Sequence, residues 1–175
     1  LIAGLKPDIS SEKLQDAIRS GTVAGVARKI HARQGDTFFI RPGMIHALGP
    51  GLLLYEVQQT SDLTYRVYDW DRPMKAGRML HIDKSLAVAD PAALAVTSSM
   101  PEFIDGDQRI VAECPYFTLE TLMAEDAAFA LDTKGDSFHA LTVIAGRALI
   151  QTDEEKLELK KYETVIVPAE MGEYK

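Results

Sequence analysis

Two segments of this chain follow one pattern, and this repeat constrains the fold more than any other feature. Residues 35–46 read GDTFFIRPGMIH, and residues 162–173 read YETVIVPAEMGE. Both place an acidic residue and a threonine at the start of an apolar strand, which then runs into a proline and a turn. Self-similarity of this kind indicates two related structural units that follow each other along the chain.

Most of the remaining sequence is typical of short β-strands. Apolar runs separated by Gly, Pro and Asp turns predict strands at residues 36–40, 52–58, 64–70, 109–114, 117–123, 138–144, 147–152, 156–159 and 164–167. Many short strands of this kind favour a sandwich or barrel over a parallel α/β sheet. The sequence therefore predicts an all-β protein.

One helix and one connection interrupt the strands. Serines cap the segment 11–19, its apolar residues have helical spacing, and Gly21 follows it, so a short helix is expected, with a further turn over residues 23–28. Residues 87–102 are richer in Ala, Pro and Ser, which marks the best candidate for an inter-domain connection.

Composition excludes several classes of function. The 175 residues are 46% hydrophobic, enough for a buried core, and carry 19 basic and 26 acidic residues for a net charge of -7, so a nucleic-acid partner is not expected. No apolar run approaches the length of a membrane span. The single cysteine, Cys114, excludes an internal disulfide and fits a cytoplasmic protein, in which we expect it to be an inert core residue. The chain starts at Leu1 in loop-like sequence, and we hypothesise that it is a piece of a longer protein.

The first copy of the repeat resembles a signature of the cupin family, in which a glycine, a strand and a Pro/Gly turn precede a metal-binding histidine. Gly35, Gly43 and His46 stand at the family's spacing, whereas Pro42 is one place later than usual. The glycines permit tight turns at either end of the strand. The resemblance implies that His46 points into the mouth of a barrel.

The second copy has lost the metal ligand, because Glu173 stands at the position of the histidine. It is expected to serve as scaffold. The other histidines, His31, His81 and His139, lack such a context and are expected to be structural or solvated. The expected architecture is thus two tandem cupin-like jelly-roll units with a short helical insertion, an incomplete unit over residues 1–97 and a degenerate unit over 98–175.

Two further polar residues lie on the strands expected after His46. If the strands 52–58 and 64–70 form a hairpin symmetric about Ser61, Glu56 lies opposite Arg66 on one face. A charged pair beside the histidine suggests a polar pocket. An ordinary cross-strand ion pair on a solvated face, worth under about 1 kcal/mol, explains the spacing equally well.

The segment from Gly35 to Asp90 resembles the class I mannose-6-phosphate isomerases of the short bacterial type, and a weaker match continues through the second unit. The matching sequence motifs are GD at 35–36, PGMIHAL at 42–48, EVQQTSD at 56–62, TYRVYD at 64–69 and RMLH at 78–81. The resemblance implies that His46 is a zinc ligand, that Arg66 is the catalytic arginine and that the substrate is a sugar phosphate. Glu56 is then a candidate to position a substrate hydroxyl or to move a proton.

One departure from the family is important. The family's other zinc ligands, a histidine in a Gln-x-His word and a glutamate, lie in an N-terminal part that would precede Leu1, and no Gln-x-His occurs here. Catalytic zinc needs about three protein ligands, so this chain alone is expected to bind zinc poorly and to be inactive. Missing strands would also leave sheet edges that favour association with another chain.

Two rival functions stay open. The first is a non-catalytic cupin domain that binds a sugar or sugar phosphate, which the missing ligands favour. The second is an iron-dependent cupin oxygenase, which the absence of a His-x-His word disfavours. A Gln-x-His word followed by a glutamate upstream of Leu1 would decide for the isomerase.

Overall fold

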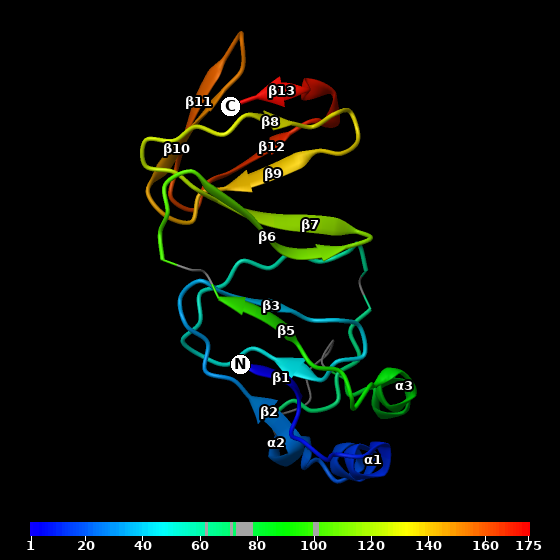
Figure 1. Ribbon diagram of the computed structural model, residues 1–175. Coiled ribbons are helices and arrows are strands. Elements are labelled where there is room, and N and C mark those ends of the chain that lie inside the picture. The colour runs from blue at the N-terminus through cyan, green and yellow to red at the C-terminus, as the bar shows by residue number, and fades with distance from the viewer. Residues whose placement is uncertain (62, 71, 73–78, 100–101) are drawn as a thin grey trace. The chain divides into compact units, whose positions relative to one another are not determined.

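The computed structural model describes residues 1–61, 63–70, 72, 79–99 and 102–175 (Figure 1). The chain divides into two compact units, each of which is described by itself. The first comprises Leu1–Glu102 and Ile110–Leu119, and the second comprises Phe103–Arg109 and Glu120–Lys175.

The first unit combines helices with short strands. Its elements are β1 (Ile2–Leu5), α1 (Ser11–Arg19), α2 (Val23–Val26), β2 (Ala27–Lys29), β3 (Asp36–Phe39), β4 (His46–Ala47), α3 (Ile82–Val88) and β5 (Val96–Ser99). The hairpin strands β6 (Asp107–Cys114) and β7 (Phe117–Met123) follow, and residues 110–119 at their turn count with this unit.

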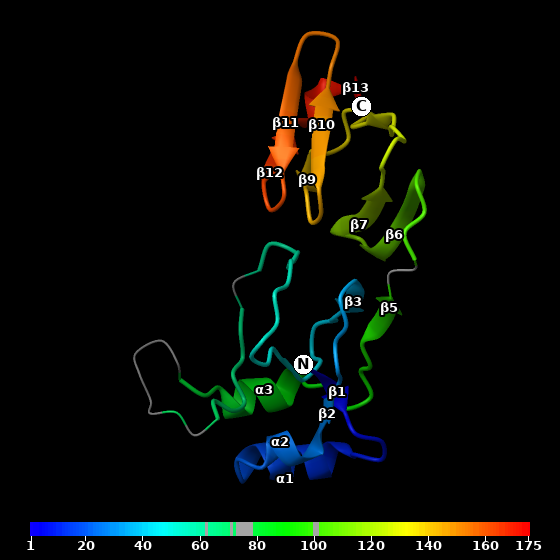
Figure 2. The same cartoon turned by 90° about the vertical axis from the view of Figure 1, so that its left-hand side faces the viewer.

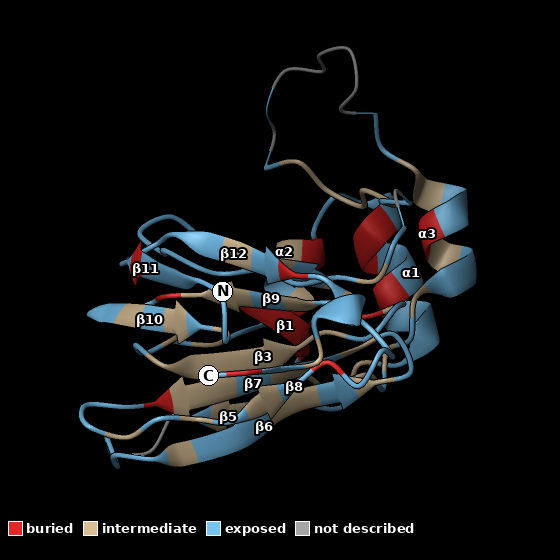
Figure 3. Cartoon of the chain, turned by 90° about the horizontal axis from the view of Figure 1, so that it is seen from above, coloured by how far each residue is buried: buried red, intermediate tan, exposed pale blue. Residues whose placement is uncertain are grey.

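Helix α1 forms where the sequence predicts it. The Ser10 hydroxyl accepts a hydrogen bond from the Lys13 backbone N–H, which caps the first turn. The helix buries one face through Leu14, Ala17 and Ile18. Buried residues accordingly gather on α1 and on β1, drawn red in Figure 3. The core cluster of the first unit consists of Leu5, Leu14, Ile18 and Val23.

Strand β1 is the centre of a three-stranded antiparallel sheet in the order β2-β1-β4. All four of its residues are buried, as expected for a strand with neighbours on both edges. In this sheet, Ala3 of β1 lies opposite His46 of β4. The candidate metal ligand is therefore carried on an edge strand beside a fully buried one.

Strands β3 and β5 form a second, two-stranded antiparallel sheet, visible in Figure 2. Phe39 pairs with Val96, and the Phe39 ring meets Phe117 edge-on at 6.3 Å between centroids. Residues 87–102, the predicted inter-domain connection, contain the strand β5, which the sequence did not predict. The composition of the segment did not predict this strand, because Val96–Ser99 is short and lies between stretches that contain Ala and Pro.

The second unit is built from paired strands. Its elements are β8 (Leu131–Asp132), β9 (His139–Thr142), β10 (Arg147–Gln151), β11 (Lys156–Lys160), β12 (Thr164–Val167), the 3-10 turn η1 (Ala169–Met171) and β13 (Glu173–Tyr174). Antiparallel pairs join β10 to β11, β12 to β9 and β13 to β8. Strands predominate among the described residues, which confirms the all-β prediction.

The two copies of the repeat share their turns in detail. In the first, Asp36 N–H donates to the Arg33 carbonyl and Met44 N–H to the Arg41 carbonyl. In the second, residues at the same spacing do the same: Glu163 donates to Lys160, and Met171 to Pro168. His46 then begins β4, and Glu173 begins β13. The repeat seen in the sequence is therefore also a repeat of backbone structure.

Two predicted strands are wrong. The described residues of 52–58 and 64–70 form no strand. The large apolar side chains of the first segment are exposed: Leu52, Leu53, Leu54, Tyr55 and Val57. Apolar residues raise strand propensity, but a strand also needs a partner for its backbone. The matching residues Asp62 and Arg78 lie outside the described residues. The predicted division between residues 97 and 98 stays a prediction.

No helix in the described ranges is long and apolar enough to cross a membrane.

Candidate metal and substrate site

His46 is exposed and oriented by its own turn. Its Nδ1 lies 3.0 Å from the carbonyl oxygen of Met44, a distance at which Nδ1–H donates a hydrogen bond. This assignment of the proton follows from the geometry. The lone pair is then on Nε2, the nitrogen farther from the backbone. Histidine ligands in metal sites commonly use their second ring N–H in this way, so His46 is suited to act as a ligand through Nε2.

The turn before His46 requires glycine. Gly43 has φ +85°, and a Cβ on this residue would lie 2.6 Å from the Val88 carbonyl oxygen. The Gly43 carbonyl in turn accepts a hydrogen bond of 2.9 Å from Asp90 N–H. Met44, the next residue, is 5% exposed. The backbone that aims His46 is thus held by the end of α3 and by the core, which gives the glycine of the sequence motif a structural reason.

The described residues do not complete a metal site around this histidine. Among them, no group of three or more His, Cys, Asp or Glu side chains is arranged to hold a metal ion. Zinc needs about three protein ligands in a catalytic site. His46 therefore lies in no three-ligand group within the described part of the chain.

Glu56 and Arg66 do not form the predicted cross-strand pair. Neither residue is in a strand, Glu56 is exposed, and no salt bridge joins it to Arg66 within the described ranges. The expected hairpin is replaced by a loop in which Gln58 Nε2 donates to the Ser61 carbonyl at 3.5 Å. The prediction of a shared face was wrong because it assumed a regular strand register.

Arg66 is instead tied to His81. Arg66 N–H donates to His81 Nδ1 at 3.3 Å, and His81 N–H donates to the Arg66 carbonyl at 2.8 Å. Arg66 is half-buried. Sequence reasoning treated His81 as merely structural, and its position in the matching word RMLH was the one signal that connected it to the site.

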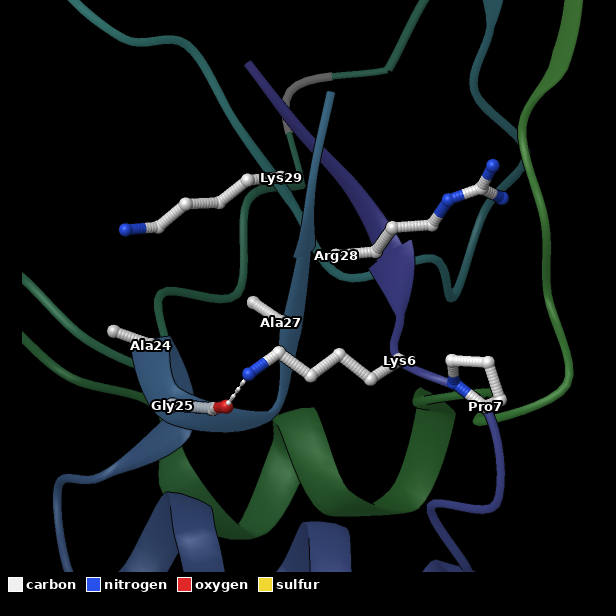
Figure 4. A pocket seen from close by; sticks show the side chains of 7 residues that line it. All are labelled: Lys6, Pro7, Ala24, Gly25, Ala27, Arg28 and Lys29. Atoms are coloured by element: carbon white, nitrogen blue, oxygen red, sulfur yellow. Dashed lines mark hydrogen bonds between the residues drawn. The ribbon is translucent and has the colours of Figure 1, made fainter. Parts of the chain in front are cut away.

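A hollow of about 450 Å³ in the first unit lies outside the predicted site residues. It is lined by Lys6, Pro7, Ala24, Gly25, Ala27, Arg28 and Lys29. Figure 4 shows Lys6 Nζ donating to the Gly25 carbonyl, a bond of 2.7 Å, while Arg28 and Lys29 extend to opposite sides of β2. Because the cationic groups diverge, the hollow does not form a built phosphate site.

The second unit holds its histidine in a polar pair. His139 Nδ1 and the Tyr174 hydroxyl are 2.6 Å apart, and Tyr174 is 3% exposed. Burial raises the pKa of Tyr174 to about 12, so its hydroxyl keeps its proton, and it shares a hydrogen bond with His139 Nδ1 whose direction depends on the histidine tautomer. This contact supports the prediction that His139 is satisfied structurally, although its partner could not be identified from the sequence.

Comparison with known proteins shows which family this chain resembles. Residues 107–175 match the family model described as "Mannose-6-phosphate isomerase, cupin domain". The chain is 29% identical to mannose-6-phosphate isomerase ManA of Bacillus subtilis, a match that covers 95% of the chain and 53% of that protein. It is 31% identical to the mannose-6-phosphate isomerase of Streptococcus mutans, over 91% of the chain and 51% of the relative.

A solved structure agrees. The crystal structure of the mannose 6-phosphate isomerase from Bacillus subtilis superposes with a TM-score of 0.78 at 31% identity, covering 99% of this chain and 55% of that one. Strand content, repeat and family match together define a cupin-type protein. Within that class, the chain is similar over nearly its whole length to mannose-6-phosphate isomerases, and it spans about half the length of the relatives it matches.

Proposed function

We propose that this chain is the C-terminal part of a zinc-dependent mannose-6-phosphate isomerase, which interconverts mannose 6-phosphate and fructose 6-phosphate. The similarity of nearly the whole chain, in sequence and structure, to the Bacillus subtilis isomerase carries the proposal. Because the chain corresponds to about half of that protein, the complete activity belongs to an assembly that includes the other half. The free Cys114 fits a cytoplasmic enzyme.

His46 supplies one zinc ligand in this proposal. Support comes from its exposed position at the start of β4 and from the Nδ1 contact to Met44, which leaves Nε2 for a metal. The resemblance assigns the remaining ligands to a Gln-x-His motif and a glutamate outside this chain, which agrees with the lack of a complete ligand group among the described residues.

Arg66 stabilises the charge that the reaction develops. Interconversion of an aldose and a ketose moves a proton between adjacent carbons through an enediol-type intermediate, and negative charge grows on the sugar oxygens. A guanidinium stays protonated at every relevant pH and offers several donors in a plane. Placed against those oxygens, it stabilises the transition state more than the ground state. Glu56, which is exposed, is proposed to position a sugar hydroxyl.

A fusion of the N-terminal half of the Bacillus subtilis isomerase with this chain tests the metal assignment. We expect the fusion to bind zinc and to isomerise mannose 6-phosphate, and His46→Ala to remove both together. His139→Ala is the matched control, because that histidine is bonded to Tyr174 and should leave zinc content unchanged. Full zinc occupancy in the His46→Ala fusion, measured by metal analysis, would contradict the assignment.

The same fusion tests Arg66. Arg66→Lys keeps the charge and discards the planar donor group, so we expect turnover to fall on the order of 10²–10³ with little change in zinc content. Arg147→Lys is the control, since Arg147 makes an exposed ion pair with Glu158 at 3.3 Å in the second unit. Turnover of Arg66→Lys within a few fold of the parent would end the catalytic role.

A non-catalytic domain that binds sugar phosphates is the second candidate. It is favoured by one observation: the described residues contain no group of three or more His, Cys, Asp or Glu side chains arranged to hold a metal ion. Calorimetry on the chain alone distinguishes the two. Binding of mannose 6-phosphate without zinc, combined with an inactive fusion, would support the binding domain.

A further inference from the structure

His81 and Arg66 are joined at two points. One bond runs from the Arg66 backbone N–H to the His81 ring at Nδ1, 3.3 Å, and the other runs from the His81 backbone N–H to the Arg66 carbonyl, 2.8 Å. The second bond uses only backbone atoms and survives any substitution other than proline. The first depends on the side chain, because only a ring nitrogen with a free lone pair can accept the N–H.

His81 is itself fixed by helix α3. It is the N-cap residue of that helix, and its carbonyl accepts a hydrogen bond of 2.8 Å from Ser85 N–H. Ile82 and Leu86 of the same helix pack against the core cluster Leu5, Leu14, Ile18 and Val23. Helix α3 therefore connects His81 to the core of the first unit. Through its bond to His81, the backbone of Arg66 is connected to the same core.

The residues after Arg66 are held by the same core. Val67 and Tyr68 both pack against that cluster, although their segment is not a strand. A loop residue with no ladder needs other restraints if its side chain is to have a defined position. Two such restraints here are the core, against which Val67 packs, and the His81 ring, which accepts the Arg66 N–H.

We propose that His81 is a positioning residue for Arg66: its Nδ1 accepts the Arg66 N–H and so fixes the backbone from which the guanidinium extends. The catalytic consequence rests on the proposed function of Arg66, whereas the anchoring itself does not. Side-chain amides provide a discriminating test. The Asn oxygen lies close to the position of histidine Nδ1, whereas the longer Gln places its polar group near the position of Nε2.

Amide hydrogen exchange of this chain, followed by NMR, tests the anchoring. We expect His81→Asn to keep the protection of the Arg66 amide, and His81→Gln and His81→Ala to lower it by about fivefold or more, the effect of one lost hydrogen bond. The Ser85 amide is the internal control, because its acceptor is the His81 backbone carbonyl. Unchanged Arg66 protection in both His81→Gln and His81→Ala would overturn the proposal.

Kinetics of the fusion test the catalytic consequence. We expect His81→Gln to lower kcat with little change in KM, and His81→Asn to restore kcat to within a few fold of the parent. A purely structural histidine predicts equal losses in Gln and Asn variants that track their melting temperatures, and that result would overturn the positioning role. An inactive parent fusion would instead count against the proposed function, while the exchange experiment would still decide the anchoring.

Discussion

Gly35 and Tyr162 stand at corresponding positions of the two repeated turns, and both have a left-handed backbone, with φ 85° and 72°. Their surroundings correspond as well: Arg33 N–H donates to the Asp36 carboxylate at 2.8 Å, and Lys160 N–H donates to the Glu163 carboxylate at 2.8 Å. The second unit has therefore kept the turn after losing the glycine that suits it. An L-residue in this region costs about 1–2 kcal/mol, a strain that the first unit avoids.

Replacing Tyr162 by glycine should therefore not harm the second unit. Relief of the left-handed strain opposes the extra chain entropy of glycine, about 0.5–1 kcal/mol, and the loss of the contact between Lys161 Nζ and the ring at 4.8 Å. We expect the free energy of unfolding to change by between zero and about +1 kcal/mol. Gly35→Ala is the mirrored control and should lower it by about 1 kcal/mol. Denaturant unfolding of both variants measures this, and a large loss for Tyr162→Gly would contradict it.

Gly43→Ala should lower the free energy of unfolding much more than the substitution of another glycine with a left-handed backbone. Its Cβ would lie 2.6 Å from the Val88 carbonyl oxygen, which is backbone and cannot move without shifting the end of α3. We expect a loss on the order of 2–4 kcal/mol. Gly51 has φ +78° and open space around it, so Gly51→Ala should show the backbone strain alone, about 1 kcal/mol. Equal losses in thermal melts of the two variants would show that the contact with Val88 is not limiting.

The sequence predicted those parts of the fold whose determinants are local. Helix α1 and strands such as Phe117–Met123 and Thr164–Val167 have the predicted bounds, because a cap, a period or a turn defines them within a few residues. Strand β5 and the loop at 52–58 were missed, since each depends on whether a distant partner strand is present. Apolar content alone does not supply that information.

The candidate site likewise contains one feature with local sequence determinants and others that depend on distant partners. His46 was singled out because its turn is recognisable in the sequence, with Gly43 directly before the buried Met44, and its role as a metal ligand stays a prediction. The link from Arg66 to His81 was missed because it joins two segments through a loop rather than through a strand register. The predicted pair of Glu56 with Arg66 relied on such a register and was wrong.

Ser85→Ala should leave stability unchanged or raise it. The Ser85 side chain is buried at 2% exposure, and its hydroxyl has no hydrogen-bond partner among the described residues. Removing it eliminates a desolvated polar group and adds a better helix former to α3, a gain of up to about 1 kcal/mol.

Thr133 provides the contrast, because this equally buried hydroxyl donates to the Ala169 carbonyl at 2.6 Å and accepts from Gly172 N–H at 2.9 Å. Thr133→Val leaves both partners unsatisfied and should cost about 1–3 kcal/mol. Chemical denaturation compares the variants. A greater loss for Ser85→Ala than for Thr133→Val would show that the Ser85 hydroxyl has an important partner.

Asp36 should make the first unit sensitive to acid. The Arg33 backbone N–H, followed by the Ser99 hydroxyl, holds the pKa of the Asp36 carboxyl below its ordinary value, because both groups donate to the charged form. The Ser99 bond, 2.7 Å, also ties β3 to β5. A group whose pKa is lower in the folded state adds stability above its unfolded pKa, and this contribution is lost as the pH falls through the folded pKa.

We therefore expect Asp36→Asn to be less stable than the parent at pH 7, and the difference between the two to shrink as the pH is lowered below about 4, the ordinary range of an aspartate. Asp153→Asn is the matched control, since Asp153 is exposed and has no recorded side-chain hydrogen bond in the described part of the chain. Ser99→Ala should reproduce part of the effect, because it removes the second donor while leaving the first. Urea unfolding at pH 7 and pH 3 measures all four proteins. A difference in the free energy of unfolding between the parent and Asp36→Asn that stays constant from pH 7 to pH 3 would contradict the prediction. That result would mean that the charge of the Asp36 carboxylate does not stabilise the β3–β5 pair.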